Sequence, residues 1–261
     1  MAKTWAKFPH ADKKFEYTSA ALKKSWDRLH KGDAEPFPKS AEVIDAWAAF
    51  HAGDFQRATE LGEKAGAEGV NVANKSQAIY ANYLESSEKK KLELFEEVAS
   101  RAERLQREQP KNANAFYWQA YALGRYAQGI SIAKALAQGI GGKVKAALET
   151  TIKLAPKHAD AHIALGAYHA EVIDKVGAMI GGLTYGAKKD AAMKNYQAAL
   201  KLNPDSAIAR IEYANGLVML EGNKALKQAE QLYAEAAACE PMDAMEKLDV
   251  EQAKAEIDDS S

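Results

Sequence analysis

Three histidines have the spacing in this chain that most resembles a metal site. His158, His162 and His169 are four and seven residues apart, which places their rings along one face of a helix. Imidazole nitrogens are common zinc ligands, but a zinc site needs three or four converging ligands. The H-E-x-x-H pattern of helical zinc enzymes is absent from the sequence. We therefore expect no metal site and no cofactor.

Nucleophilic catalysis also finds little support in the residue types present. Cys239 is the single cysteine, and its segment AAACEP contains no histidine that could act as a base. The sequence has no G-x-S-x-G elbow and no G-x-x-x-x-G-K-[ST] phosphate loop. The lone cysteine excludes an internal disulfide and favours a reducing compartment. We expect a protein that is not an enzyme and has no catalytic residues.

Aromatic residues offer a better candidate for binding chemistry. Their rings could present flat apolar surfaces to a ligand, with Arg125 and Asn215 fixing its orientation. We expect part of this row to be accessible and the rest to pack in the core. The row comprises Phe116, Tyr117, Trp118, Tyr121 and Tyr126 on one predicted helix, and Tyr168 and Tyr213 on two later helices.

Prolines divide the chain into helical hairpins. Pro110, Pro156, Pro204 and Pro241 each follow an apolar helical pattern, and proline cannot continue a helix because it lacks an amide donor. Polar residues after the prolines, namely Asn112, Asp160 or the polar residues before it, and Asp205 and Ser206, are suited to cap the next helix. The predicted helices lie at about 18–30, 40–51, 54–66, 74–87, 88–108, 113–127, 143–154, 159–174, 187–202, 206–220, 224–239 and 243–257.

The packing positions in these hairpins resemble the tetratricopeptide repeat (TPR). Tyr196, Ala199 and Pro204 have the spacing of its second helix, as do Tyr233, Ala236 and Pro241, and GDFQRA from Gly53 resembles its turn. The resemblance covers roughly residues 40–241. It implies an all-α fold, a right-handed α-solenoid of about five helix pairs whose first helices line a concave face.

Two glycine-flanked insertions interrupt the repeat at the same place in adjacent units. Pro110 to Pro156 is 46 residues and Pro156 to Pro204 is 48, whereas the repeat period is about 34. The insertions, GISIAKALAQG from Gly129 and GAMIGGLTYG from Gly177, fall between the paired helices of units three and four. Their apolar residues predict helices packed in the core, a hydrophobic groove or a self-association surface. These residues are Ile130, Ile132, Leu136 and Ile140, and Met179, Ile180, Leu183 and Tyr185.

A narrower resemblance concerns the first insertion. The segment GISIAKALAQGIGGKVKAALETTIKLAP is similar to degenerate TPR proteins of the regulator of microtubule dynamics type and to T-components of TRAP transporters. The second insertion departs from this pattern because it loses most of the lysines. The T-component resemblance implies a hydrophobic channel and a partner solute-binding protein. Those proteins are exported lipoproteins, and no lipobox cysteine lies near Met1. We therefore carry over the hydrophobic ligand from this resemblance as an expectation, and not the exported location.

Charge and hydropathy bound the location and the partners. The formal net charge of −1 argues against nucleic acid, whose phosphates demand a basic excess. We expect a cytoplasmic protein, because no signal-peptide core is evident and no apolar stretch approaches the length of a transmembrane helix. We divide the chain into a basic, aromatic arm with a short helix at 1–39, the repeat domain at 40–241, and a capping helix with an acidic tail at 242–261.

These observations predict a non-enzymatic scaffold that binds a peptide or helix of a partner protein on its concave face. The alternative is a protein that binds a hydrophobic small molecule or lipid in a groove lined by the two insertions. Self-association is a further possibility. The candidate residues are Tyr117, Trp118, Tyr121, Arg125, Ile132, Leu136, Tyr168, Met179, Ile180, Leu183, Tyr185, Tyr213 and Asn215.

Overall fold

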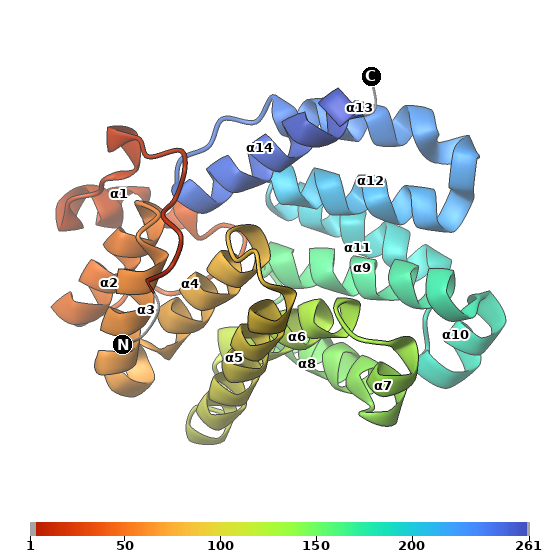
Figure 1. The fold of residues 1–261 in the computed structure, drawn as a ribbon, viewed down its shortest axis with the longest axis horizontal. Helices are drawn as coiled ribbons and strands as arrows, with labels where there is room; N and C mark the ends of the chain where they lie inside the picture. The colour runs from red at the N-terminus through yellow and green to blue at the C-terminus, as the bar shows by residue number, and fades with distance from the viewer. Residues whose placement is uncertain (1–3, 260–261) are drawn as a thin grey trace. The chain divides into compact units, whose positions relative to one another are not determined.

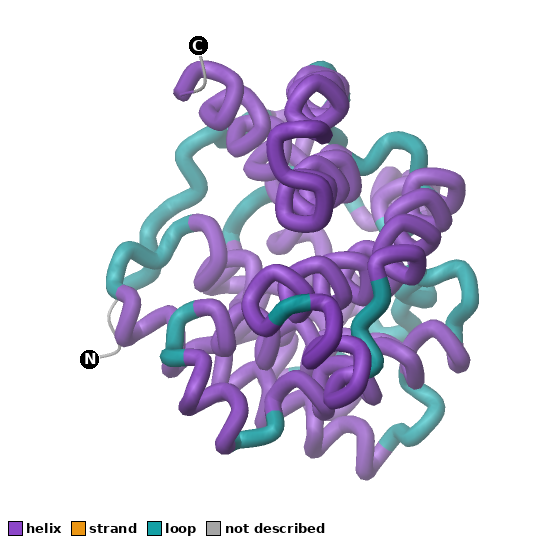
Figure 2. The backbone as a smooth tube through the Cα atoms, turned by 90° about the vertical axis from the view of Figure 1, so that its right-hand side faces the viewer, coloured by secondary structure: helices purple, strands orange, loops and turns teal. Residues whose placement is uncertain are grey.

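The described residues of the protein, 4–259 in a computed structural model, form helices joined by loops, without a strand among them (Figures 1 and 2). This is the predicted all-α class. The ends of the two predicted terminal segments, residues 1–3 and 260–261, lie outside the described part. The chain divides into two compact units. The first holds the residues up to His30, Glu35–Leu154 and Met242–Met245, and the second holds Lys31–Ala34, Ala155–Pro241 and the residues from Glu246 onward.

In the first unit, successive helices pack against one another along the chain. α2 packs on α3, α3 on α4, α4 on α5, α5 on α6, and α6 on α8 (Figure 1). The elements are η1 (Lys13–Phe15), α1 (Ser19–Leu29), α2 (Ala41–His51), α3 (Phe55–Lys64), η2 (Gly66–Glu68), α4 (Val70–Tyr83), α5 (Glu88–Glu108), α6 (Ala113–Gln128), α7 (Ile132–Ala137) and α8 (Ile140–Leu154).

In the second unit, α9 packs against α11 and α12, and α12 packs against α13. The elements are α9 (Ala159–Val176), α10 (Ala178–Tyr185), α11 (Lys189–Leu202), α12 (Ala207–Glu221), η3 (Gly222–Ala225), α13 (Leu226–Ala237) and α14 (Ala244–Asp259), of which α14 has its first two residues in the first unit.

The helix starts follow the polar residues that the sequence places after the prolines. Asn112 accepts the amide of Ala115 at the start of α6, and Ser206 accepts the amide of Ala209 at the start of α12. At α9 the cap is His158, whose Nδ1 accepts the amide of Ala161. Asp160 lies inside the first turn of α9. Each cap satisfies one of the amides that a helix leaves unpaired at its N-terminus.

Each insertion forms a short helix of its own, α7 and α10. The insertions therefore do not lengthen the neighbouring helices. In the second insertion, Gly177 and Gly186 bound α10 with φ of +80° and +63°. Glycine adopts these values without a Cβ clash, so each end of α10 can turn sharply.

The core of the second unit is built around a tyrosine wedge. Tyr196 of α11 is fully buried and stacks on Tyr213 of α12, with ring centroids 5.1 Å apart. A Cβ on Gly166 of α9 would come within 2.9 Å of the Tyr196 ring, and one on Gly216 of α12 within 2.4 Å of its hydroxyl. The two glycines therefore allow one ring to fill the space between three helices.

The N-terminal arm docks on the first repeat pair. Trp5 stacks on Tyr80 of α4 with ring centroids 4.1 Å apart, and its amide donates to Gln56 Oε1 of α3. Phe8 packs edge-on against Phe55, next to Gly53 at the turn between α2 and α3. These contacts use the aromatic residues of the arm as packing groups.

The C-terminal helix packs on the last repeat pair. Val250 and Ala253 of α14 are buried in a cluster with Ile211 of α12 and Ala236 of α13. α14 thus covers apolar surface of α12 and α13 in the second unit. Such covering is what the end of a repeat stack needs.

Two lysines of α14 bind the carboxylate of Glu251, and the contribution of this carboxylate to stability depends on pH in acid. Glu251 contacts Lys247 at 2.7 Å and Lys254 at 2.9 Å, and hydrogen bonds from these two lysines lower its pKa to about 2 from an ordinary value of 4.5. Because the folded pKa is depressed, the stabilisation is complete above about pH 4.5 and is lost as the pH falls towards 2. We expect Glu251→Gln to lower the free energy of unfolding by less than about 1 kcal/mol at pH 7, since the pair is partly exposed. Denaturant unfolding at pH 7 and pH 3 should show this difference shrinking, and a constant difference would contradict it.

Candidate partner-binding site

The aromatic row of α6 forms a cluster in the first unit. Trp118 lies 4.9 Å from Tyr117 and 5.4 Å from Tyr121, measured between ring centroids. Tyr117 and Trp118 are buried, as is Tyr126, so these rings pack between α6 and its neighbours. Tyr121 keeps part of its surface accessible.

Tyr121 and Arg125 form the accessible edge of this cluster. They lie one turn apart on α6, and the Arg125 guanidinium sits 5.4 Å from the centroid of the Tyr121 ring. Arg125 Nη1 also donates to Gln128 Oε1 at 3.2 Å. A planar cation beside a partly exposed ring, on a rigid helix, is a surface of the kind that recurs at the centre of protein interfaces.

The first insertion leaves its apolar residues exposed. Ile132 and Leu136 of α7 are 48% and 47% exposed, and α7 has no buried residue, whereas Ile140 at the start of α8 is buried. Lys134 reaches back to the α6 cluster, with its ammonium 5.5 Å from the Tyr126 centroid. The hydrogen bond with Tyr126 raises the pKa of Lys134.

In the second insertion, a small residue faces the protein and the large apolar residues face outwards. Gly181 is the buried residue of α10 and faces Val172 and Ile173 of α9. The large residues point away, with Met179, Ile180 and Leu183 exposed by 75%, 51% and 85%. The end of α10 is held to α9 by the Tyr168 hydroxyl, which donates to the Tyr185 carbonyl at 3.1 Å. The two insertions belong to different compact units.

The remaining candidates, Tyr168, Tyr213 and Asn215, lie on α9 and α12 of the second unit. Tyr213 is buried against Tyr196, and Asn215 accepts a 2.5 Å hydrogen bond from the Tyr233 hydroxyl. Burial raises the pKa of Tyr233 to about 12. Asn215 is partly accessible. Tyr168 and Tyr213 thus pack between helices, and Asn215 is the one of the three with a polar group at the surface.

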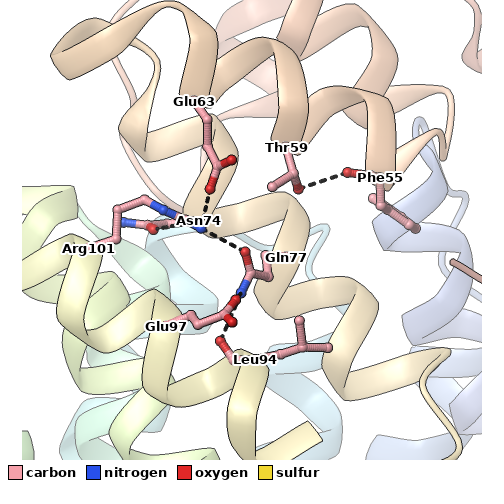
Figure 3. Close-up of polar contacts among 8 residues, drawn as sticks. All are labelled: Phe55, Thr59, Glu63, Asn74, Gln77, Leu94, Glu97 and Arg101. Atoms are coloured by element: carbon pink, nitrogen blue, oxygen red, sulfur yellow. Dashed lines mark hydrogen bonds and ion pairs between the residues drawn. The ribbon is translucent and has the colours of Figure 1, made fainter. Parts of the chain in front are cut away.

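Sequence reasoning missed a polar network in the first unit (Figure 3). Arg101 of α5 donates to Asn74 and Gln77 of α4 at 3.0 and 2.8 Å, and to Glu63 of α3 at 2.5 Å. Burial lowers the pKa of Arg101, and the Glu63 carboxylate opposes this effect. The guanidinium is occupied by three acceptors, so the network braces α3, α4 and α5.

A second polar group in the first unit was also missed. The Glu35 carboxylate accepts from Asn71 of α4 at 2.9 Å and from Asn114 of α6 at 2.5 Å. Both asparagines are buried, and buried amides require partners of this kind. The signal in the sequence was a run of polar residues, NVANKSQ, on an otherwise apolar helix. These residues fix the connector before α2 against two first helices.

The histidines are engaged in structural hydrogen bonds. His158 caps α9, His162 Nδ1 lies 2.8 Å from Asn195 Oδ1, and His169 Nδ1 accepts the amide of Lys188 at 3.4 Å. Among residues 4–259, no group of three metal-ligating side chains converges. Cys239 packs at the edge of the cluster between α12 and α13, and its Sγ lies 3.4 Å from the Glu235 carbonyl.

In the part of the chain that is described, no helix is both long and apolar enough to cross a bilayer.

The arrangement of the helices is similar to that of a solved structure, a thermophilic TPR protein of Thermus thermophilus. The match has a TM-score of 0.57 and 18% sequence identity, and it covers 82% of this chain and 97% of that chain. The chain therefore has the TPR-like α-solenoid fold, which confirms the predicted fold class and the resemblance drawn from its packing positions. No protein-family model matches the sequence, and no curated protein matches it.

Proposed function

We propose that the chain is a cytosolic, non-enzymatic interaction scaffold that binds a peptide or helix of a partner protein. The support is the fold, in which packed helix pairs present first-helix surfaces to a partner. The observation that carries the proposal is the Tyr121 and Arg125 pair, a partly exposed ring and guanidinium 5.4 Å apart on one rigid helix. The buried rings beneath it, Tyr117 and Trp118, hold this surface in place.

Affinity capture from native extract, followed by titration of the captured partner, tests this surface. We expect Tyr121→Ala and Arg125→Ala each to weaken binding by about tenfold or more, because aromatic and arginine side chains dominate interface energies. Lys89→Ala on α5 is the matched control, since Lys89 is exposed and lies outside the candidate site. Wild-type affinity in both folded α6 variants would contradict the proposal.

The exposed apolar residues of α7 and α10 favour a second candidate, a hydrophobic small molecule or lipid as ligand. Native mass spectrometry after gentle purification separates the two candidates. A bound mass that is lost in Leu183→Ser supports the small-molecule ligand. A ligand-free protein that captures a polypeptide through Tyr121 and Arg125 supports the scaffold.

A further inference from the structure

The inserted helices have the reverse of the usual helix orientation. A helix on a protein surface normally turns its large apolar residues to the core and its small or polar residues outwards. On α10 the glycine Gly181 faces α9, while Met179, Ile180 and Leu183 face outwards. Positions i, i+1 and i+4 lie on one side of a helix, so these three side chains form a single apolar surface.

The same design recurs in the first insertion. Ile132 and Leu136 of α7 lie one turn apart and are both exposed, and no residue of α7 is buried. Two insertions at equivalent places in adjacent repeats therefore each expose a short apolar helix. Folding of the chain does not explain this exposure, because neither surface contributes to a core.

The charges of the first insertion indicate an anionic partner surface. Residues 128–148 contain Lys134, Lys143 and Lys145 and no aspartate or glutamate, and Lys145 pairs with Glu149 just beyond them. Residues 176–187 carry no charge, and the charged residues beside them have both signs: Asp174 and Asp190 accompany Lys188, while Lys175 pairs with Glu171 and Lys189 with Glu221. Apolar side chains with lysines beside them match the boundary between the acyl chains and the anionic headgroups of a bilayer.

The size of each surface argues against a second protein as the occupant. A stable protein interface buries about 800 Å² on each partner, which takes roughly 20–30 residues a side. The surface of α10 consists of three large side chains and that of α7 of two. A membrane needs no such complementary area, because each inserted side chain gains independently from leaving water.

We propose that α7 and α10 are anchors, each of which docks its own compact unit on the surface of a membrane containing anionic lipids. Met179, Ile180 and Leu183, and Ile132 and Leu136, enter the boundary between headgroups and acyl chains. Lys134 and Lys143 of the first insertion contact the headgroups. This binding is peripheral, and it uses residues other than the partner-binding edge at Tyr121 and Arg125.

Vesicle flotation of the full chain tests the proposal. The wild type is expected to float with phosphatidylcholine vesicles that contain phosphatidylserine, and less with phosphatidylcholine alone. Leu183→Ser should lower the bound fraction about tenfold, since burying a leucine side chain is worth about that factor or more. Lys134→Gln with Lys143→Gln should weaken binding only to the vesicles with phosphatidylserine. These residues are exposed, so circular dichroism should show unchanged helicity.

Met219→Ser provides the matched control, because Met219 is an exposed apolar residue of α12 outside both insertions. It should leave flotation unchanged. The proposal is overturned if the wild type fails to float with anionic vesicles, or if Met219→Ser reduces binding as much as Leu183→Ser. Sedimentation that shows a dimer abolished by Leu183→Ser would instead identify α10 as a contact between copies of this chain.

Discussion

Gly216→Ala is expected to lower the free energy of unfolding by about 2–3 kcal/mol. A Cβ at this position would lie 2.4 Å from the Tyr196 hydroxyl and 2.6 Å from its ring, and the ring is itself fully buried. The Tyr196 ring has little room to move away, since it packs so closely on Gly166 of α9 that a Cβ there would lie 2.9 Å from it. This clash outweighs the gain of about 1 kcal/mol that alanine brings to a helix interior. Denaturant unfolding followed by circular dichroism measures the change.

Gly124→Ala is the matched control, because Gly124 also lies inside a first helix, α6, but a Cβ there would meet nothing within 4 Å. It should raise the free energy of unfolding by about 0.5–1 kcal/mol. Tyr196→Phe should partly rescue Gly216→Ala, since it removes the nearest atom. The Tyr196 hydroxyl is buried without a hydrogen-bond partner among residues 4–259, so this substitution alone should cost nothing. Stabilisation by Gly216→Ala would contradict the close packing of Tyr196 against Gly216.

The helices could be predicted from the sequence because their signals are local. Prolines at 110, 156, 204 and 241 end the helical patterns, and caps such as Asn112 and Ser206 begin the next helices. The spacing of Tyr196, Ala199 and Pro204 reflects packing that every such repeat requires. The predicted pairs accordingly match α2 with α3 through α12 with α13.

The candidate site could be predicted only in part, because burial depends on contacts distant in the sequence. Periodicity put Tyr117, Trp118 and Tyr121 on one helix, but which ring remains accessible is decided by the packing of α6 on α5 and α8. The apolar pattern of the second insertion could not reveal that Gly181 faces inwards and Leu183 outwards. The Arg101 network joins three helices through residues up to 38 positions apart, which no local pattern encodes.

A buried hydrogen bond predicts the second large effect. His51 Nδ1 of α2 lies 2.8 Å from Asp243 Oδ2, and the side chains are 0% and 2% exposed. Beside it, the Tyr17 hydroxyl donates to the Met242 carbonyl at 2.8 Å. These contacts hold Met242 and Asp243 in the first unit.

Asp243→Ala should lower the free energy of unfolding by about 2–3 kcal/mol, since it leaves a ring nitrogen of His51 buried without its hydrogen-bond partner. Glu93→Ala is the control, because the Lys89 and Glu93 pair is exposed and 3.8 Å apart, and its loss should cost less than about 0.5 kcal/mol. Adding His51→Phe to Asp243→Ala should cost less than the sum of the two single changes, since each removes the same interaction. Strict additivity in this double-mutant cycle would mean that the pair does not hold the segment. Hydrogen exchange at Met242–Met245 is a second measurement, and in that case it would remain slow in Asp243→Ala.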